Sequence, residues 1–181
     1  MSGISAADVK ALRERTNAGV IECRNALQET NGDMDKAAEL LRQRGIAKAG
    51  KKSEREANQG LVEAYLHGGR IGAMVELNCE TDFVARNEAF RSLAREIARQ
   101  VVAMSPRYVS AEERPAQYGA DDPDHQALLD QPYVKDPKKT IGDMVKENIA
   151  TLGENIVVRR FVRYELGRSE EALAQAASSG E

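Results

Sequence analysis

The sequence predicts an α+β protein, with three short helices at the N-terminus followed by a small core of three antiparallel strands packed against helices. Two observations predict this class. Up to residue 50, apolar residues recur every three or four positions, as on one face of a helix. Residues 71–80 instead place apolar side chains on alternate positions, as in a half-buried strand. The chain order is helices, hairpin, helix, loop, helix and strand.

Residues 1–50 contain start and stop signals for three helices. Hydroxyl, carboxylate and glycine residues suit helix starts, and Asn or Gly suits the left-handed turn that follows a helix. The signals, in chain order, are Ser5, Thr16-Asn17, Gly19, Asn31-Gly32, Asp33 and Gly45. The inward apolar positions are Val9, Leu12, Val20, Cys23, Leu27, Ala37, Leu40 and Leu41. We expect residues 1–50 to form a domain of their own.

A polar linker is predicted at residues 51–59, and it can be helical in part. The second domain, residues 60–167, begins with a hairpin whose strands, 61–66 and 71–80, flank a Gly-Gly turn. Asn87 then caps a long helix with an apolar stripe, which covers the sheet and stops at Ser105-Pro106. The stripe consists of Phe90, Leu93, Ala94, Ile97, Ala98, Val101 and Val102.

The second half of this domain begins with a long loop, because residues 106–138 contain all five prolines and little periodicity. A short turn is expected at 126–129. Thr140 caps a further helix, which ends at Gly153, and the β-branched and aromatic residues 156–164 predict the third strand. The last residues, 168–181, are small and polar and are expected to be a disordered tail.

Charge and composition exclude several classes of function. The 181 residues include 26 basic and 29 acidic ones, for a net charge of −3, so no strong positive field attracts a phosphate backbone. Eight aromatic residues, three Phe and five Tyr, offer few stacking platforms. No apolar run suits a signal peptide or a membrane span. We expect a cytoplasmic protein that contacts neither nucleic acid nor membrane directly.

Candidates for chemistry are few. Cys23 and Cys79 have no second cysteine or histidine at metal-ligand spacing, so both are expected to be reduced, buried and inert. A single disulfide between them is the alternative. His67 and His125 lie in no context that would activate a nucleophile. The sequence therefore predicts no catalytic residue, no metal and no cofactor.

Four motifs resemble those of one protein family. The segments LRERTNAGVIECRNAL (12–27) and GDMDKAAELLRQRGIAKA (32–49) resemble the N-terminal domain of elongation factor Ts. The segment VELNCETDFVARNEAF (75–90) is similar to its central signature. QPYVKD and GENIVVRRFVRYELG are similar to its C-terminal one. The resemblance covers most of residues 5–167 and has the motifs in the family's order.

The resemblance implies a function. It implies that residues 1–50 are a ubiquitin-associated-like (UBA-like) domain, and that the chain exchanges guanine nucleotide on elongation factor Tu. The residues that it implies at the partner's magnesium site are Thr81, Asp82, Phe83 and Val84. Those that it implies on a helix of the partner's nucleotide domain are Arg13, Val20 and Ile21. Short family members are expected to form homodimers, here through an exposed sheet edge.

The chain departs from the family at two places. Asn17 stands where the family usually has glycine, but Asn tolerates the same left-handed turn. Compared with other family members, the loop 106–131 lacks one helical segment. The resemblance therefore does not define the form of the dimer.

The residues alone leave alternatives at each candidate position. Phe83, seven residues before Phe90, could continue the buried stripe, and only the resemblance favours an exposed side chain. Asp82 also suits the positive end of a helix dipole. Val20 and Ile21 are adjacent, so either one faces out or both fit a wide core face. Arg13 is more often a solvated charge than a contact.

Arginines on the last strand, Arg159, Arg160 and Arg163, suggest either an anion site or, more commonly, the solvated edge of a sheet. Three other classes of protein compete with an exchange factor. They are an enzyme, an adaptor that binds helices or ubiquitin-like proteins, and a nucleic-acid binder.

Overall fold

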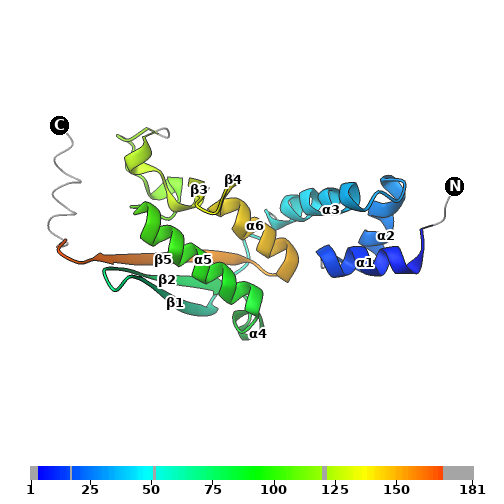
Figure 1. The fold of residues 1–181 in the computed structure, drawn as a ribbon, viewed down its shortest axis with the longest axis horizontal. Coiled ribbons are helices and arrows are strands. Elements are labelled where there is room, and N and C mark those ends of the chain that lie inside the picture. Colours follow the sequence, from blue (N-terminus) through cyan, green and yellow to red (C-terminus); the bar gives the residue numbers. More distant parts are fainter. Residues whose placement is uncertain (1–3, 17, 51, 120–121, 169–181) are drawn as a thin grey trace.

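The computed structural model describes residues 4–16, 18–50, 52–119 and 122–168. Three helices lie at one end of an elongated molecule, and a sheet with its covering helices forms the rest (Figure 1). The helices α1 (Ala6–Thr16), α2 (Val20–Glu29) and α3 (Met34–Ala49) form the N-terminal module. The predicted α+β class is confirmed.

Local signals start the helices of the module as the sequence predicts. The Ser5 hydroxyl accepts the amide of Asp8 at 3.1 Å, and the Asp33 carboxylate accepts the amide of Lys36 at 3.0 Å. Gly19 precedes α2 with an extended backbone. The module has its own apolar cluster, formed by the buried residues Leu12, Cys23, Ala26, Leu27, Ala37 and Leu41. Leu40, predicted to point inward, is only partly buried beside this cluster.

Helix α3 continues past Gly45, where the sequence predicts its end. A Cβ atom at Gly45 would lie 2.7 Å from the Cβ of Ala150, so the glycine permits α3 to approach another helix closely. That helix is α6 (Ile141–Leu152). Arg42 and Glu147 form an ion pair at 3.2 Å across the same contact. Gly45 therefore lies in the contact between α3 and α6 rather than at the end of a helix.

The sheet has three antiparallel strands in the order β1-β2-β5. Strand β1 (Gln59–His67) pairs with β2 (Ile71–Cys79), and β2 pairs on its other side with β5 (Ile156–Glu165). Residues 68–70 join β1 to β2, and the amide of Arg70 donates to His67 O at 3.0 Å. The two residues between them, Gly68 and Gly69, have φ angles of +56° and +68°, which glycine adopts without strain. The predicted hairpin and third strand are confirmed.

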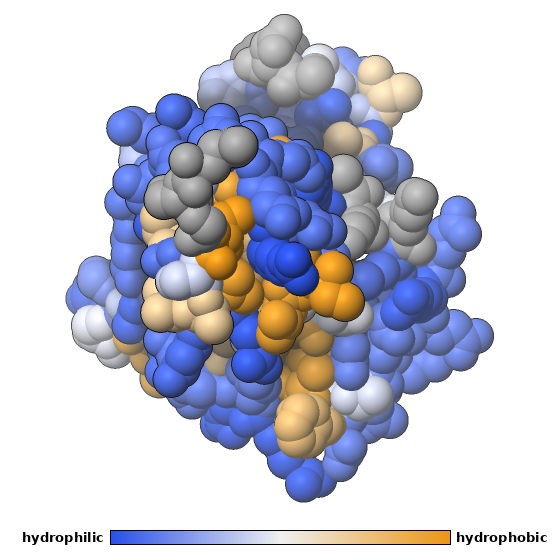
Figure 2. All heavy atoms as spheres, turned by 90° about the vertical axis from the view of Figure 1, so that its right-hand side faces the viewer, coloured by the Kyte–Doolittle hydropathy of each residue, from blue (hydrophilic) through white to orange (hydrophobic). Residues whose placement is uncertain are grey.

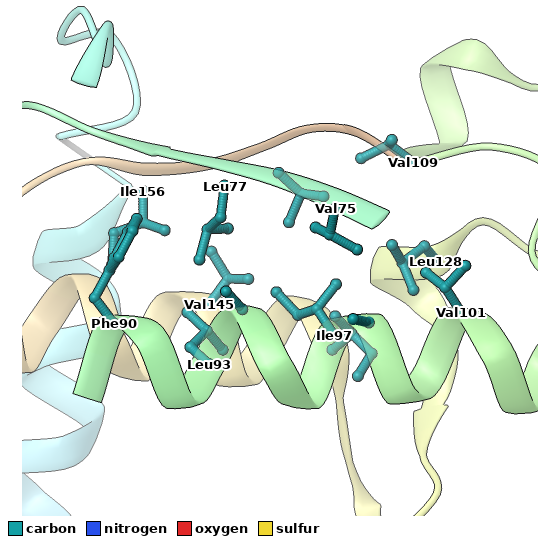
Figure 3. Packing of buried hydrophobic residues seen from close by; sticks show 14 of the residues in the cluster. Val75, Leu77, Phe90, Leu93, Ile97, Val101, Val109, Leu128, Val145 and Ile156 are labelled. Carbon is teal, nitrogen blue, oxygen red and sulfur yellow. The ribbon is translucent and has the colours of Figure 1, made fainter. Parts of the chain in front are cut away.

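One face of the sheet packs on helices. Figure 3 shows Val75, Leu77 and Ile156 pointing from the strands toward α5 (Glu88–Met104), whose Phe90 and Ile97 point back at them. Helix α6 packs beside α5 and adds further residues to the same cluster. Asn87 caps α5 and Thr140 caps α6, as predicted. The main core therefore lies between this face of the sheet and the two helices.

The segment expected to be one long loop contains a small hairpin. After 3-10 turns at Ala111–Glu113, Pro123–His125 and Leu128–Asp130, strand β3 (Pro132–Tyr133) pairs with β4 (Asp136–Thr140). Buried Gln100 of α5 holds this hairpin, because its amide donates to Pro132 O at 3.0 Å and accepts from Val134 N at 3.0 Å. Strands this short, with two prolines, lack the alternation by which a strand is predicted.

The disordered tail expected at 168–181 lies outside the described residues, except for Arg168. Within the described part of the chain, every helix is too short or too polar to cross a lipid bilayer.

Candidate partner-binding site

A single-turn helix, α4 (Asp82–Ala85), follows the central strand. The Thr81 hydroxyl caps it by accepting the amide of Val84 at 3.3 Å. Phe83 projects from this helix with 79% of its surface exposed, the largest fraction among the exposed large apolar residues. Phe83 therefore does not continue the buried stripe of α5. We call residues 81–84 the tip.

Asp82 lies beside Phe83 and is exposed. Its carboxylate forms an ion pair with Arg86, one turn on, at 2.7 Å. Both side chains are mostly exposed to solvent, so this pair contributes little to stability. The carboxylate can therefore exchange Arg86 for another cation at small cost.

The four residues of the tip have different environments. Val84 is only 5% exposed and packs in the main core, so its side chain does not reach the surface in this structure. The Thr81 hydroxyl is engaged by groups of the same chain, since it also donates to Glu154 at 2.6 Å. Thr81, Asp82 and Phe83 are exposed, and Phe83 and Asp82 are the two whose side chains make no contact with Glu154. Val84 instead anchors the short helix.

The N-terminal module presents a second apolar surface. Val20 and Ile21 are both exposed, at 56% and 74%, so the alternative of a wide core face is wrong. The prediction that Val20 points inward with Cys23 and Leu27 is also wrong. They occupy the first turn of α2, whose buried residues Cys23, Ala26 and Leu27 face the other way. Arg13 is exposed on α1. Figure 2 looks onto this end of the molecule and shows apolar residues gathered within an otherwise hydrophilic face.

The outer face of the sheet is a third exposed apolar surface, which the sequence did not predict. It consists of Val62, Leu66, Met74, Val162 and Tyr164, which are 38–73% exposed. The strand register brings Met74 opposite Val162, and Gly72 opposite Tyr164. The sequence of β1 does contain a sign of this surface, because Leu61 and Val62 are adjacent and both apolar. Successive side chains of a strand point to opposite faces, so one of the two must lie on the outer face.

Other candidate residues have structural roles. Arg160 pairs with Glu76 at 2.7 Å and Arg163 with Glu165 at 2.7 Å, while Arg159 is exposed. The two pairs give acidic partners to two of the three arginines and favour the solvated-edge interpretation over an anion site.

The cysteines are free and buried, so the alternative of a Cys23–Cys79 disulfide is wrong. Burial raises the pKa of the Cys79 thiol to about 11, which makes it a poor nucleophile near neutral pH. Among the described residues, no group of three His, Cys, Asp or Glu side chains could hold a metal ion.

Exposed apolar side chains on separate parts of a chain are typical of a protein that acts by binding other proteins. Comparison with known proteins defines the class further. Residues 7–126 match the family model described as elongation factor TS. Elongation factor Ts of Caldanaerobacter subterraneus subsp. tengcongensis is 46% identical over 198 aligned positions, covering 93% of this chain and 99% of the relative.

Two further relatives agree. Elongation factor Ts of Moorella thermoacetica is 47% identical and covers 91% of this chain and 96% of its own length. That of Thermodesulfovibrio yellowstonii is 43% identical, with 93% and 98% covered. The chain belongs to the elongation factor Ts family, and its role is that of a translation elongation factor in protein biosynthesis.

Proposed function

We propose that the chain is a guanine-nucleotide exchange factor for elongation factor Tu. It binds the GDP form of that GTPase, promotes loss of magnesium and GDP, and so permits GTP to bind. The observation that carries this proposal is Phe83, an aromatic side chain 79% exposed on a single-turn helix beside the carboxylate of Asp82. The chain forms and breaks no covalent bond, so it is not an enzyme of covalent chemistry.

Binding alone supplies the mechanism. If the chain binds the empty GTPase more tightly than the GDP form, linkage weakens GDP binding by the same factor. An acceleration of about a thousandfold requires roughly 4 kcal/mol of barrier lowering. One aromatic side chain that becomes buried in the complex, together with a few polar contacts, is able to supply this amount.

Within the tip, Phe83 acts as the wedge and Asp82 as the charged group. The Asp82 carboxylate exchanges its exposed contact with Arg86 for groups around the magnesium site, at the small cost of a surface ion pair. Val84 supports this action from the core. The tip therefore acts on bound nucleotide, rather than supplying most of the docking energy.

The N-terminal module supplies the docking surface. Val20 and Ile21 are adjacent at the start of α2 and both exposed, so they fit an apolar groove or helix on the partner. Exposed Arg13, on α1, adds a cation at the side of this contact. These contacts do not depend on the state of the nucleotide pocket.

The experiment is the release of fluorescent GDP from elongation factor Tu, with and without the chain. The exchange factor predicts a release rate that rises with the concentration of the chain and then saturates. An adaptor that only binds the GTPase would form a complex and leave the release rate at its spontaneous value. That second result would overturn the proposal.

We propose also that two copies of the chain associate through the outer face of the sheet. Its five exposed apolar residues form one surface, and a twofold axis would place this surface against itself. One pair of opposite charges, Glu76 and Arg160, lies on the same face, since Arg160 is the register partner of Glu76. The proposal uses the open face of the sheet, in place of the exposed sheet edge that the sequence analysis suggests, because the exposed apolar residues lie on that face.

Sedimentation velocity tests the dimer. The wild-type chain should sediment as a dimer at micromolar concentration, and Leu66→Glu should be a folded monomer, because Leu66 is 73% exposed on this face. Met104→Glu is the matched control, because Met104 is exposed at the end of α5, away from the sheet face. A monomeric wild type would remove the proposal.

Each proposed domain has its own role. We assign docking to the UBA-like domain, 1–50, and exchange and self-association to the core domain, 60–167, with 51–59 as linker and 168–181 as tail. A partner that acts in translation implies a cytoplasmic location.

A further inference from the structure

The tip is tied to a loop that lies far away in the sequence. Glu154, between α6 and β5, accepts three hydrogen bonds from Thr81, the first residue of the tip, and from Glu80, which precedes it. Its Oε2 accepts the amides of Glu80 and Thr81 at 3.1 and 3.0 Å, and its Oε1 accepts the Thr81 hydroxyl at 2.6 Å. Hydrogen bonds to a charged acceptor are the strong ones, and three converge on this carboxylate.

The Thr81 hydroxyl transmits this contact to the helix that carries Phe83. Because it donates its proton to Glu154, its lone pairs are left to accept the amide of Val84 at 3.3 Å. That second bond is the cap of α4. A helix of four residues cannot maintain itself by its own hydrogen bonds, so its direction depends on its cap and its anchor.

The same loop holds the linker that leaves the N-terminal module. The amide of Asn155 donates to Glu80 Oε1 at 2.6 Å. Its side chain, in a residue only 2% exposed, donates to the carbonyl oxygens of Arg55 at 2.7 Å and Ser53 at 3.3 Å. Residues 154 and 155 therefore contact the tip and the linker at once.

We propose that Glu154 is a positioning residue for nucleotide exchange, which sets the direction of Phe83 through the hydroxyl of Thr81. The inference rests on the proposed exchange function. Glu154 itself does not touch the partner. It fixes the tip before the complex forms, so that the aromatic wedge reaches the nucleotide site without a search among orientations.

This role makes a specific kinetic prediction. In Glu154→Gln, one acceptor oxygen becomes an NH₂ donor, so the side chain can accept either the amides of Glu80 and Thr81 or the Thr81 hydroxyl, but not all three bonds. The docking residues Val20 and Ile21 are unaffected. We therefore expect the maximal rate of GDP release to fall about tenfold, while the half-saturating concentration of the chain changes less than about twofold.

Two substitutions at Thr81 test the relay independently. Thr81→Val keeps the shape but removes the hydroxyl, and should reproduce the loss of maximal rate. Thr81→Ser keeps the hydroxyl and should retain most of the wild-type rate. The matched control is Glu63→Gln, which also removes one carboxylate charge, from a side chain that pairs with Arg95 of α5 at 3.3 Å on the core side of the sheet. It should leave the exchange rate unchanged.

Release of fluorescent GDP from elongation factor Tu is measured for each variant over a range of concentrations, with a urea unfolding curve for each. The proposal is overturned if Glu154→Gln retains the wild-type maximal rate, or if Thr81→Ser loses as much as Thr81→Val. It is also overturned if the loss appears in the half-saturating concentration, or if Glu63→Gln loses rate equally.

The failure of the inference is distinguishable from that of the proposed function. If wild type accelerates release and Phe83→Ala slows it while Glu154→Gln does not, only the positioning role is wrong. If wild type does not accelerate release, both are wrong.

Discussion

The two surfaces assigned to the partner are built in different ways. Val20 and Ile21 lie in the first turn of a ten-residue helix, whose start is set by neighbouring Gly19 and Glu22. Phe83 lies on a four-residue helix, whose cap is oriented by a carboxylate 73 residues further along the chain. The surface on α2 is therefore defined by residues close to it in the sequence. The surface on α4 forms only when the sheet and the loop that carries Glu154 are folded.

This difference has a functional meaning. A docking surface on a regular helix needs only to be exposed and apolar, because it is the same before and after nucleotide leaves. A wedge must point in one direction, so it needs support from outside its own segment. The comparison predicts that variants of the first surface change affinity, and that variants of the second change rate.

The largest expected effect is on stability, and it tests whether each surface rests on its own core. Ile97→Ala should cost about 2–5 kcal/mol by leaving a cavity in the main core beneath the sheet, where Ile97 is fully buried. Leu27→Ala should cost a similar amount in the separate cluster of the module. Urea unfolding with probes in each part measures both. Equal loss at both probes for each variant would show one shared core and break the comparison.

The next largest effect is on the rate of exchange. Phe83→Ala should lower the maximal rate of GDP release by tenfold or more, because it removes the aromatic anchor, and should leave stability unchanged, because the side chain is 79% exposed. Asp82→Ala should act in the same direction. Met104→Ala, also exposed, is the control. A wild-type maximal rate in both tip variants would contradict the assignment of this segment.

A smaller effect is expected at the docking surface. The double variant Val20→Ala with Ile21→Ala should raise the half-saturating concentration about fivefold and leave the maximal rate unchanged, because both side chains are exposed and lie away from the tip in the sequence. The same GDP-release titration measures it. A fall in maximal rate with unchanged half-saturation would reverse the roles given to the two surfaces.

The smallest effect concerns the helix that leads into the Glu154 loop. The amide of Thr140 donates to Asp143 at 3.1 Å, and this bond lowers the pKa of the Asp143 carboxyl below its usual 3.8. The folded state thus favours the charged form, so the stabilisation is present above about pH 3.8 and is lost as pH falls through the lower folded pKa.

Asp143→Asn should therefore cost about 0.5–1 kcal/mol at neutral pH and less near pH 3. Urea unfolding of wild type and variant at both pH values measures the difference. A cost that is constant or grows toward acid pH would contradict this origin. The module surface should be unaffected, so the half-saturating concentration of the chain should not change.

Much of the fold follows from periodicity and caps. The three N-terminal helices, the Gly-Gly hairpin, α5, α6 and the third strand all have local signals in the sequence. Gly45 could not be interpreted correctly, because its role is a contact with Ala150, more than a hundred positions away. The β3–β4 hairpin was missed because it is held by the side chain of Gln100 rather than by its own pattern.

The sequence likewise predicts part of the candidate site. The adjacency of Val20 and Ile21 indicates from the sequence that one of them faces out. The exposure of Phe83 could be expected only from the family motif, since its spacing to Phe90 favours burial. The contact of Glu154 with Thr81 has no local signal at all, because it joins two loops that only the folded sheet brings together.

The central claim is that the chain prefers the GTPase with an empty pocket, and the affinities of the chain for the two forms test it most directly. Calorimetric titration into elongation factor Tu, nucleotide-free and saturated with GDP, gives both dissociation constants. We predict that the empty form binds at least about a hundredfold more tightly, which corresponds to about 2.7 kcal/mol. Equal affinities would contradict the account, because a ligand that does not distinguish two states cannot shift their equilibrium.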